Sequence, residues 1–214
     1  MKLRLTALAA LTLLSACRHN SGELTDENGG GIYAVRSACP IAGIPTGTGD
    51  ITLFNPAGST DASAIDVTAA ISSVHTSCQD VGNEVVSTAT FTVVGLRRDA
   101  GEARQVVLPY FDVALQGGQS IAAKKIGQAV LSFPAGNIHA QTQVQATIRV
   151  NRSVATLPEN VRQMLTRPRK AGGAEAASDP LADPAIRTAV SNATFEHLVG
   201  FQLTQDQLRY NATR

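Results

Sequence analysis

Strict alternation of apolar and polar residues along several segments constrains the fold more than any other feature. In residues 85–96, apolar side chains share one face and threonines the other: Ala89, Phe91 and Val93 against Thr88, Thr90 and Thr92. Residues 143–150 alternate in the same way. Successive side chains of an extended chain point to opposite faces, so a period of two is typical of a half-buried β-strand. Such strands need a second apolar layer to cover them.

Further strand candidates are separated by turns that contain Gly or Asn. They cover residues 50–54, 67–78, 106–115, 121–126, 130–133 and 198–203. Near Ser72 the alternation slips by one residue, which predicts a β-bulge. No strong helical periodicity competes through residue 151. We therefore predict an all-β fold, an antiparallel Ig-like β-sandwich.

The pattern changes after this β region. Residues 158–166 predict one short helix that begins at Pro158. Residues 171–185 are rich in Ala and Gly, so we expect a flexible excursion. Within it, Asp179 and Asp183 each precede a proline, which is typical of turns rather than of calcium ligands.

The first seventeen residues have the composition of an export signal. Lys2 and Arg4 precede an apolar run over residues 5–14, which is shorter than the roughly 20 residues that a membrane-spanning helix needs. The run ends in Leu-Ser-Ala-Cys17, which resembles a bacterial lipobox, where a peptidase cuts before the cysteine and the cysteine is lipidated. A single acyl chain binds membranes weakly, so stable anchoring at Cys17 requires more than one chain. We expect the lipoprotein pathway to supply several.

These signals divide the chain into five predicted parts. They are a lipoprotein signal peptide (1–16), a lipidated tether (17–31), a β-sandwich domain (32–152 plus 194–204), a flexible loop with a short helix (153–193) and a C-terminal helical turn and tail (205–214). Thr204, immediately before the last part, forms a predicted capping box with Gln207.

Charge argues against one class of partner. Removal of residues 1–16 takes away two of the 18 basic residues and leaves 16 against 17 acidic ones, a net charge near −1. A dedicated nucleic-acid binder normally carries a basic patch, so we expect no nucleic-acid partner. With no Trp in the chain, the core must consist mainly of aliphatic residues and a few Phe.

The three cysteines predict one disulfide. Lipidation of Cys17 leaves Cys39 and Cys78 in an oxidising compartment. A bond between them closes a loop of about forty residues, which the chain-entropy estimate values at roughly 4 kcal/mol. The alternative is a metal-binding or redox-active pair, but no C-x-x-C spacing supports it.

No arrangement of residues points to catalysis, a metal ion or a cofactor. The chain lacks the G-x-S-x-G and H-E-x-x-H motifs, and its carboxylates are scattered. His75 lies three residues before Cys78, but two ligands do not make a metal site. His197 stands beside Glu196, and we expect it to be a surface histidine. The prediction is therefore a non-enzymatic protein.

Two groups of residues are candidate contacts for a ligand or partner. Tyr110 alternates with a predicted apolar side made by Val107, Phe111 and Val113, so we expect Tyr110 to be exposed. Its alternative role is packing against the opposite sheet or the C-terminal segment. The second group is a small basic cluster in the polar segment 158–185, composed of Arg167, Arg169 and Lys170. Its alternative role is a solvated loop.

Several motifs resemble one family. They are Leu108-Pro109-Tyr110-Phe111, Phe133-Pro134, Cys39-Pro40, the second cysteine at Cys78 and the ending FEHLVGFQLTQDQLRYN over residues 195–211. Together they resemble a family of uncharacterised lipoproteins from alphaproteobacteria, over about residues 33–151 and 195–211. The resemblance implies an exported, lipid-anchored Ig-like fold, and it brings no known reaction, ligand or catalytic residue.

Two functional hypotheses follow. The first is a lipid-anchored Ig-like module that faces the periplasm and contacts another envelope protein through its surface or an edge strand. Arg18 follows the lipidated cysteine where enterobacterial lipoproteins retained at the inner membrane carry Asp, which favours the outer membrane. The alternative is a module that binds a small glycan or lipid of the envelope, which requires a pocket with converging polar groups.

Overall fold

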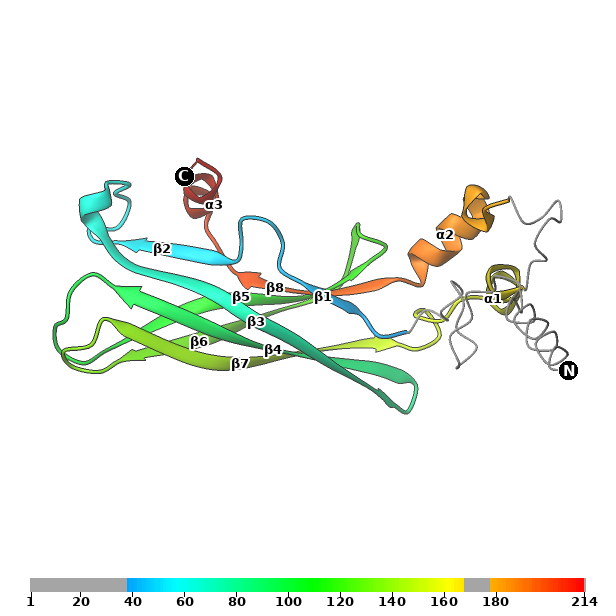
Figure 1. The fold of residues 1–214 in the computed structure, drawn as a ribbon, viewed down its shortest axis with the longest axis horizontal. Helices are drawn as coiled ribbons and strands as arrows, with labels where there is room; N and C mark the ends of the chain where they lie inside the picture. Colours follow the sequence, from blue (N-terminus) through cyan, green and yellow to red (C-terminus); the bar gives the residue numbers. More distant parts are fainter. Residues whose placement is uncertain (1–37, 168–177, 214) are drawn as a thin grey trace, which may run out of the picture. The chain divides into compact units, whose positions relative to one another are not determined.

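The computed structural model describes residues 38–167 and 178–213. The predicted signal peptide, Cys17 and the tether lie outside the described residues. Within the described residues, eight strands form two four-stranded sheets, ordered β1-β8-β5-β6 and β2-β3-β4-β7 (Figure 1). The strands are β1 Ile41–Gly43, β2 Asp50–Phe54, β3 Ile65–Val81, β4 Glu84–Arg97, β5 Arg104–Gln116, β6 Ser120–Phe133, β7 His139–Asn151 and β8 Phe195–Phe201.

Among these eight strands, β1 and β8 are the one parallel pair, and all other neighbours are antiparallel. β4 pairs with β7, while the β5–β6 hairpin between them belongs to the other sheet. The chain therefore crosses between the sheets before β5 and again after β6. This order differs from that of immunoglobulin constant domains, in which the first, second, fifth and fourth strands form one sheet.

The alternation in β4 and β7 sets the two faces of their sheet. Phe91 and Val93 of β4 and Ile148 of β7 are buried, whereas the threonines between the β4 positions lie on the outer face. The predicted bulge is confirmed, because the β3–β4 register shifts between Ser72 and His75. Ser73, which lies in the bulge, has a positive φ of 53°.

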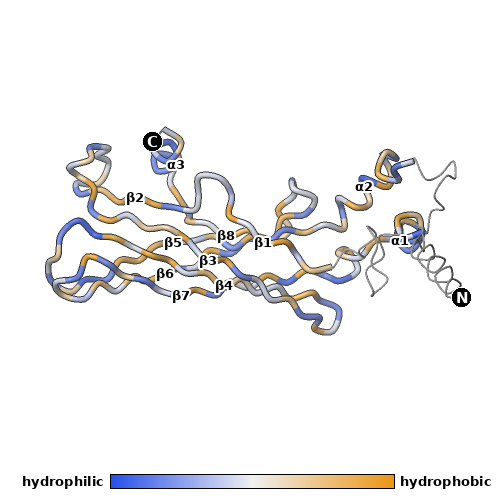
Figure 2. Tube along the Cα trace, viewed as in Figure 1, coloured by the Kyte–Doolittle hydropathy of each residue, from blue (hydrophilic) through white to orange (hydrophobic). Residues whose placement is uncertain are grey.

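Both sheets contribute to the core between them. The main cluster joins Phe91 of β4 to Phe133 and Phe201 of the opposite sheet, all fully buried. Full burial of such a side chain contributes about 1.5–3 kcal/mol. The strongly hydrophilic residues gather mainly in the connections between strands (Figure 2). The sandwich interior is therefore filled with side chains along most of its length.

Helices occupy the connections outside the sheets. They are the short 3₁₀ turns η1 Ala62–Ala64 and η2 Pro180–Ala182, and the α-helices α1 Glu159–Thr166, α2 Pro184–Asn192 and α3 Gln205–Thr213. The predicted helix at residues 158–166 is confirmed by α1. The predicted capping box is also confirmed: Gln207 N donates to Thr204 Oγ1 and Thr204 N donates to Gln207 Oε1.

The prediction of a flexible excursion is wrong for its C-terminal part. α2 begins inside the range 171–185 and buries Ile186. Asp183 caps this helix by accepting a hydrogen bond from Ala185 N, and Pro184 stands at the first helical position. Asp179 makes the same contact with Leu181 N, so both aspartates serve in local turns and caps as predicted.

Candidate functional site

His197 lies in the sandwich interior, so the prediction of a surface histidine is wrong. Its side chain is 0% exposed and sits on the inner face of β8. Nδ1 lies 2.9 Å from Ser87 Oγ, which comes from β4 of the opposite sheet. Nε2 lies 2.8 Å from Asp112 Oδ1 on β5. Three strands thus bring a serine, a histidine and an aspartate into one hydrogen-bonded network.

The network satisfies each of its members but offers nothing to a substrate. A neutral imidazole with its proton on Nε2 donates to Asp112 and accepts from the Ser87 hydroxyl at Nδ1. In serine hydrolases, Nε2 faces the serine and Nδ1 the aspartate, the reverse of the geometry seen here. Ser87 is also fully buried, so no carbonyl group from solvent reaches its Oγ. The network therefore connects the two sheets.

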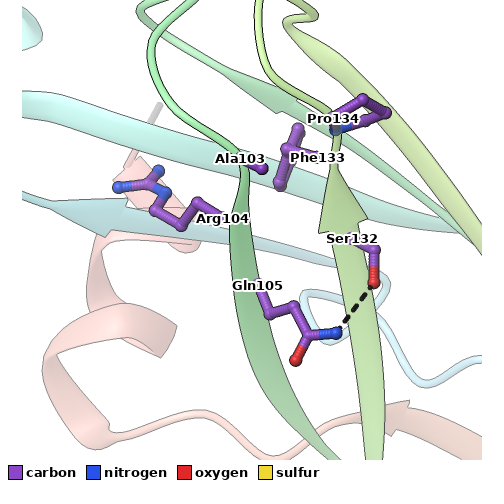
Figure 3. Close-up of a pocket in the computed structure, with 6 residues that line it drawn as sticks. All are labelled: Ala103, Arg104, Gln105, Ser132, Phe133 and Pro134. Atoms are coloured by element: carbon purple, nitrogen blue, oxygen red, sulfur yellow. Dashed lines mark hydrogen bonds between the residues drawn. The ribbon is translucent and has the colours of Figure 1, made fainter.

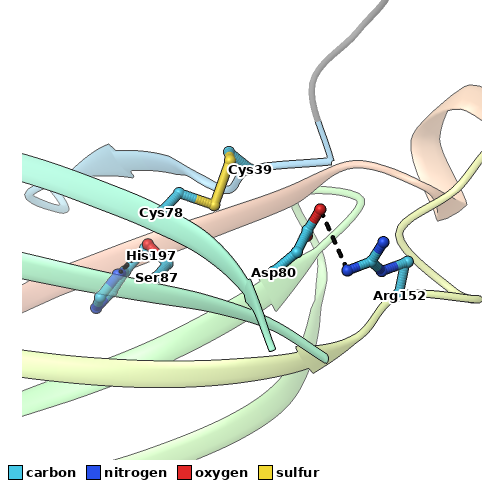
Figure 4. The surroundings of a disulfide bond; sticks show 6 residues. All are labelled: Cys39, Cys78, Asp80, Ser87, Arg152 and His197. Atoms are coloured by element: carbon cyan, nitrogen blue, oxygen red, sulfur yellow. Dashed lines mark hydrogen bonds and ion pairs between the residues drawn. A yellow bond between two sulfur atoms is a disulfide. The ribbon is translucent and has the colours of Figure 1, made fainter. Parts of the chain in front are cut away.

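The predicted disulfide between Cys39 and Cys78 is confirmed, with the two Cα atoms 5.9 Å apart. Cys78 is the cross-strand partner of Ser87, so the disulfide lies beside the His197 network (Figure 4). Cys39 precedes β1 in one sheet and Cys78 belongs to β3 in the other. A covalent bond and a hydrogen-bonded bridge therefore join the two sheets at the same place.

Tyr110 faces the core, so the prediction of an exposed tyrosine is wrong. The residue is 9% exposed and packs edge-on against Phe91 of the opposite sheet, with ring centroids 5.4 Å apart. Tyr110 therefore has the alternative role given above, which was packing against the opposite sheet. Its ring also covers Gly127, its cross-strand partner on β6. Burial, and to a smaller extent the negative charge of Asp112, raises the pKa of the Tyr110 phenol above 10.0.

The basic cluster cannot be assembled from the described residues. Arg167 is exposed just after α1, and Arg169 and Lys170 lie outside the described residues. Another arginine is more informative. Arg97 is buried at the end of β4 and donates to the carbonyl oxygens of Asn137, Glu102, Gly101 and Pro134. This side chain holds the β4–β5 and β6–β7 connections together.

A shallow, open depression lies near this end of the molecule (Figure 3). It is lined by Ala103, Arg104, Gln105, Ser132, Phe133 and Pro134. Its polar groups already have protein partners: Gln105 Nε2 donates to Ser132 Oγ, and Arg104 forms an ion pair with Asp66. Polar groups that hold a small ligand would have to converge on an enclosed space. The depression lacks that geometry.

The outer face of the β1-β8-β5-β6 sheet is unexpectedly apolar. We call it the apolar outer face; its apolar residues are Ile41, Val107, Pro109, Phe111, Val113, Leu115, Ile121, Ile126, Val130 and Leu198. Val107, Ile121 and Ile126 are 50%, 63% and 54% exposed. The strand register aligns these residues across neighbouring strands, with Lys124, Gln128 and Glu196 among them on the same face; Val113 in the middle is buried at 7% exposure.

The other sheet supplies the contrast. The middle of its outer face, which we call the polar outer face, carries Ser72, His75, Ser77, Thr88, Thr90, Thr92, Gln143, Gln145 and Thr147, and the exposed Val94 and Leu96 follow at the end of β4. A solvated face of an antiparallel sheet is normally polar, as this one is. Sequence reasoning missed the apolar outer face, although the signal was present: β5 is apolar at both alternating sets of positions.

No protein-family model matches the sequence, and neither a curated protein nor a solved structure is significantly similar to it. Within the described residues, every helix is too short or too polar to cross a membrane.

Proposed function

We propose that this protein is a lipid-anchored module of the bacterial cell envelope that acts by protein–protein contact and catalyses no reaction. In this proposal it belongs to the alphaproteobacterial lipoprotein family that its motifs resemble. The signal at residues 1–17 supports export and acylation of Cys17, with the module facing the periplasm from the outer membrane. The two-sheet sandwich supplies a rigid body for a binding surface.

The apolar outer face is the observation that carries the proposal. Contiguous apolar patches of a few hundred Å² on a soluble domain commonly mark interaction sites. This one occupies the middle of a sheet face, where its shape is held by strand pairing on both sides of β5. We expected the partner contact at residues 158–185, and we now propose it at the apolar outer face instead. The small-ligand alternative has less support, because the depression near Arg104 has its polar groups paired.

A crosslinking pull-down tests the proposal. The lipidated protein is recovered from detergent-solubilised membranes, and its partners are identified by mass spectrometry. The double variant Val107→Asp, Ile126→Asp places two charges on the apolar outer face and should lose a partner that the wild type retains. Thr90→Asp on the polar outer face is the matched control and should keep it. Equal recovery with all three proteins would overturn the proposal.

Anchoring is tested separately. If Cys17 carries the acyl chains, Cys17→Ala should leave an unprocessed product without lipid. Normal processing of this variant, measured by intact mass, would refute the lipidation.

A further inference from the structure

Two charged residues on the apolar outer face indicate which kind of partner can bind there. Lys124 on β6 and Glu196 on β8 stand on opposite sides of β5, which presents only apolar side chains between them. Val113 pairs with Lys124, whereas Leu115, two residues further, pairs with Glu196. The two charges are therefore offset by one row of the sheet.

Both charges are available to a partner. Among the described residues, neither Lys124 nor Glu196 takes part in an ion pair; Lys124 Nζ lies over the Phe111 ring, 5.9 Å from its centre. A face with one cation and one anion on its two flanks is complementary to itself after a half-turn. Closed two-fold contacts of this kind are the commonest arrangement of homo-oligomers.

The strand order selects the direction of the two-fold axis. An axis roughly parallel to β5 sets β6 of one copy against β8 of the other and leaves each row opposite the same row. Lys124 then lies opposite Leu198 of the second copy, one row away from Glu196 of that copy, and this diagonal Lys–Glu pair forms twice. An axis perpendicular to the strands would set β6 against β6 and bring no opposite charges together. Aligned sheets normally pack about 10 Å apart at about 30°, a gap that Lys and Glu side chains span.

The size of the apolar outer face indicates how strong the contact between two copies should be. From Val107 to Leu115 the face is about 27 Å long, and three strands make it about 14 Å wide, from the usual rise and spacing of strands. Each copy then contributes about 400 Å², or about 800 Å² in total, below the size of standard stable interfaces. The contact should therefore be reversible, and attachment of both copies to one membrane would favour it by raising their effective concentration.

We propose that the apolar outer face docks on the same face of a second copy, across a two-fold axis parallel to β5, with Lys124 one row from Glu196 of the second copy. This proposal rests on the proposed function, because it names the partner of the same surface. β5 lies on the axis, so each of its outward side chains faces its own counterpart in the second copy.

Chemical crosslinking of the full-length protein in membranes tests this geometry. Val107→Cys, treated with a short bis-maleimide, should form a dimer through residue 107. Thr90→Cys on the polar outer face is the matched control and should not. Intact mass and a urea unfolding curve verify that each variant keeps the Cys39–Cys78 bond and the fold. Absence of a dimer with folded Val107→Cys would overturn the proposal.

Charge reversal in the Val107→Cys background gives a second, independent readout. Lys124→Glu and Glu196→Lys should each lower the crosslinked fraction by roughly tenfold or more, because each sets like charges on neighbouring rows across the contact. The double variant should restore it. A dimer that is insensitive to both reversals would overturn the assigned axis. Crosslinking only to a protein of another mass, or only to lipid, would overturn self-docking; the former result would still support the proposed function and the latter would not.

Discussion

Replacement of Asp112 by Leu would measure what the buried network contributes to folding. In the wild type, His197 Nε2 lies 2.8 Å from Asp112 Oδ1. The variant leaves this nitrogen without a partner, and His197 is fully buried. An unpartnered buried polar group costs about 1–3 kcal/mol, and a hydrogen bond to a charged group contributes about 1.5–3 kcal/mol. We expect the free energy of unfolding to fall by about 2–3 kcal/mol, where these ranges overlap.

Urea unfolding of the mature, oxidised protein, followed by far-UV circular dichroism, gives this free energy. A double-mutant cycle with His197→Leu isolates the interaction, since the double variant leaves no charged group buried at this place. Its cost should be about 2 kcal/mol smaller than the sum of the two single costs. Asp66→Ala is the control, because it breaks the exposed ion pair with Arg104 and should cost less than about 1 kcal/mol.

Two results would refute the reasoning. Asp112→Leu could cost no more than Asp66→Ala, which would mean that the buried carboxylate does not stabilise the fold. Alternatively, the two single costs could add up to that of the double variant. His197 would then fill space between the sheets without linking Asp112 to Ser87.

Four further predictions concern other parts of the sandwich. Arg97→Met should lower the free energy of unfolding by about 3 kcal/mol and expose the neighbouring loop to trypsin, because four carbonyl groups lose their donor; unchanged urea midpoints and cleavage rates would contradict this. Gly127→Ala should cost about 1–3 kcal/mol and lower the Tm, since its Cβ would collide with the buried Tyr110 ring. Tyr110→Phe should flatten the loss of stability above about pH 10, measured by urea midpoints: the folded pKa is raised above the unfolded value of 10.0, so stability is full below that value and declines as the pH rises through the folded pKa. Replacement of both Cys39 and Cys78 by Ser should lower the free energy of unfolding by about 4 kcal/mol, and a wild-type value would contradict the loop-closure argument.

Features with a local physical cause were predictable from the chain. The β3 bulge follows from a slip in alternation, and the Thr204–Gln207 capping box from two residue types at a fixed spacing. Two misses were also within reach. Asp183 followed by Pro184 is a helix start, and His197 occupies the same alternating set as Phe195, Val199 and Phe201, all of them buried.

The orientation of β5 had no local cause. Leu108 and Tyr110 occupy one alternating set of positions, Val107 and Phe111 the other, and both sets are apolar. Alternation alone could not decide which set faces the core. Packing decides it, because Gly127 on the neighbouring strand leaves room for the Tyr110 ring on the inner face.

Residues close together in the chain predicted most of the strands and the start of the last helix, and a count of cysteines predicted the Cys39–Cys78 disulfide. The meeting of Ser87, Asp112 and His197, and the apolar outer face of one sheet, depend instead on residues that are distant in the chain. His197 is separated by 110 residues from Ser87 and by 85 from Asp112. Such contacts depend on which strands pair and in what register, and that is set by the packing of the two sheets as a whole.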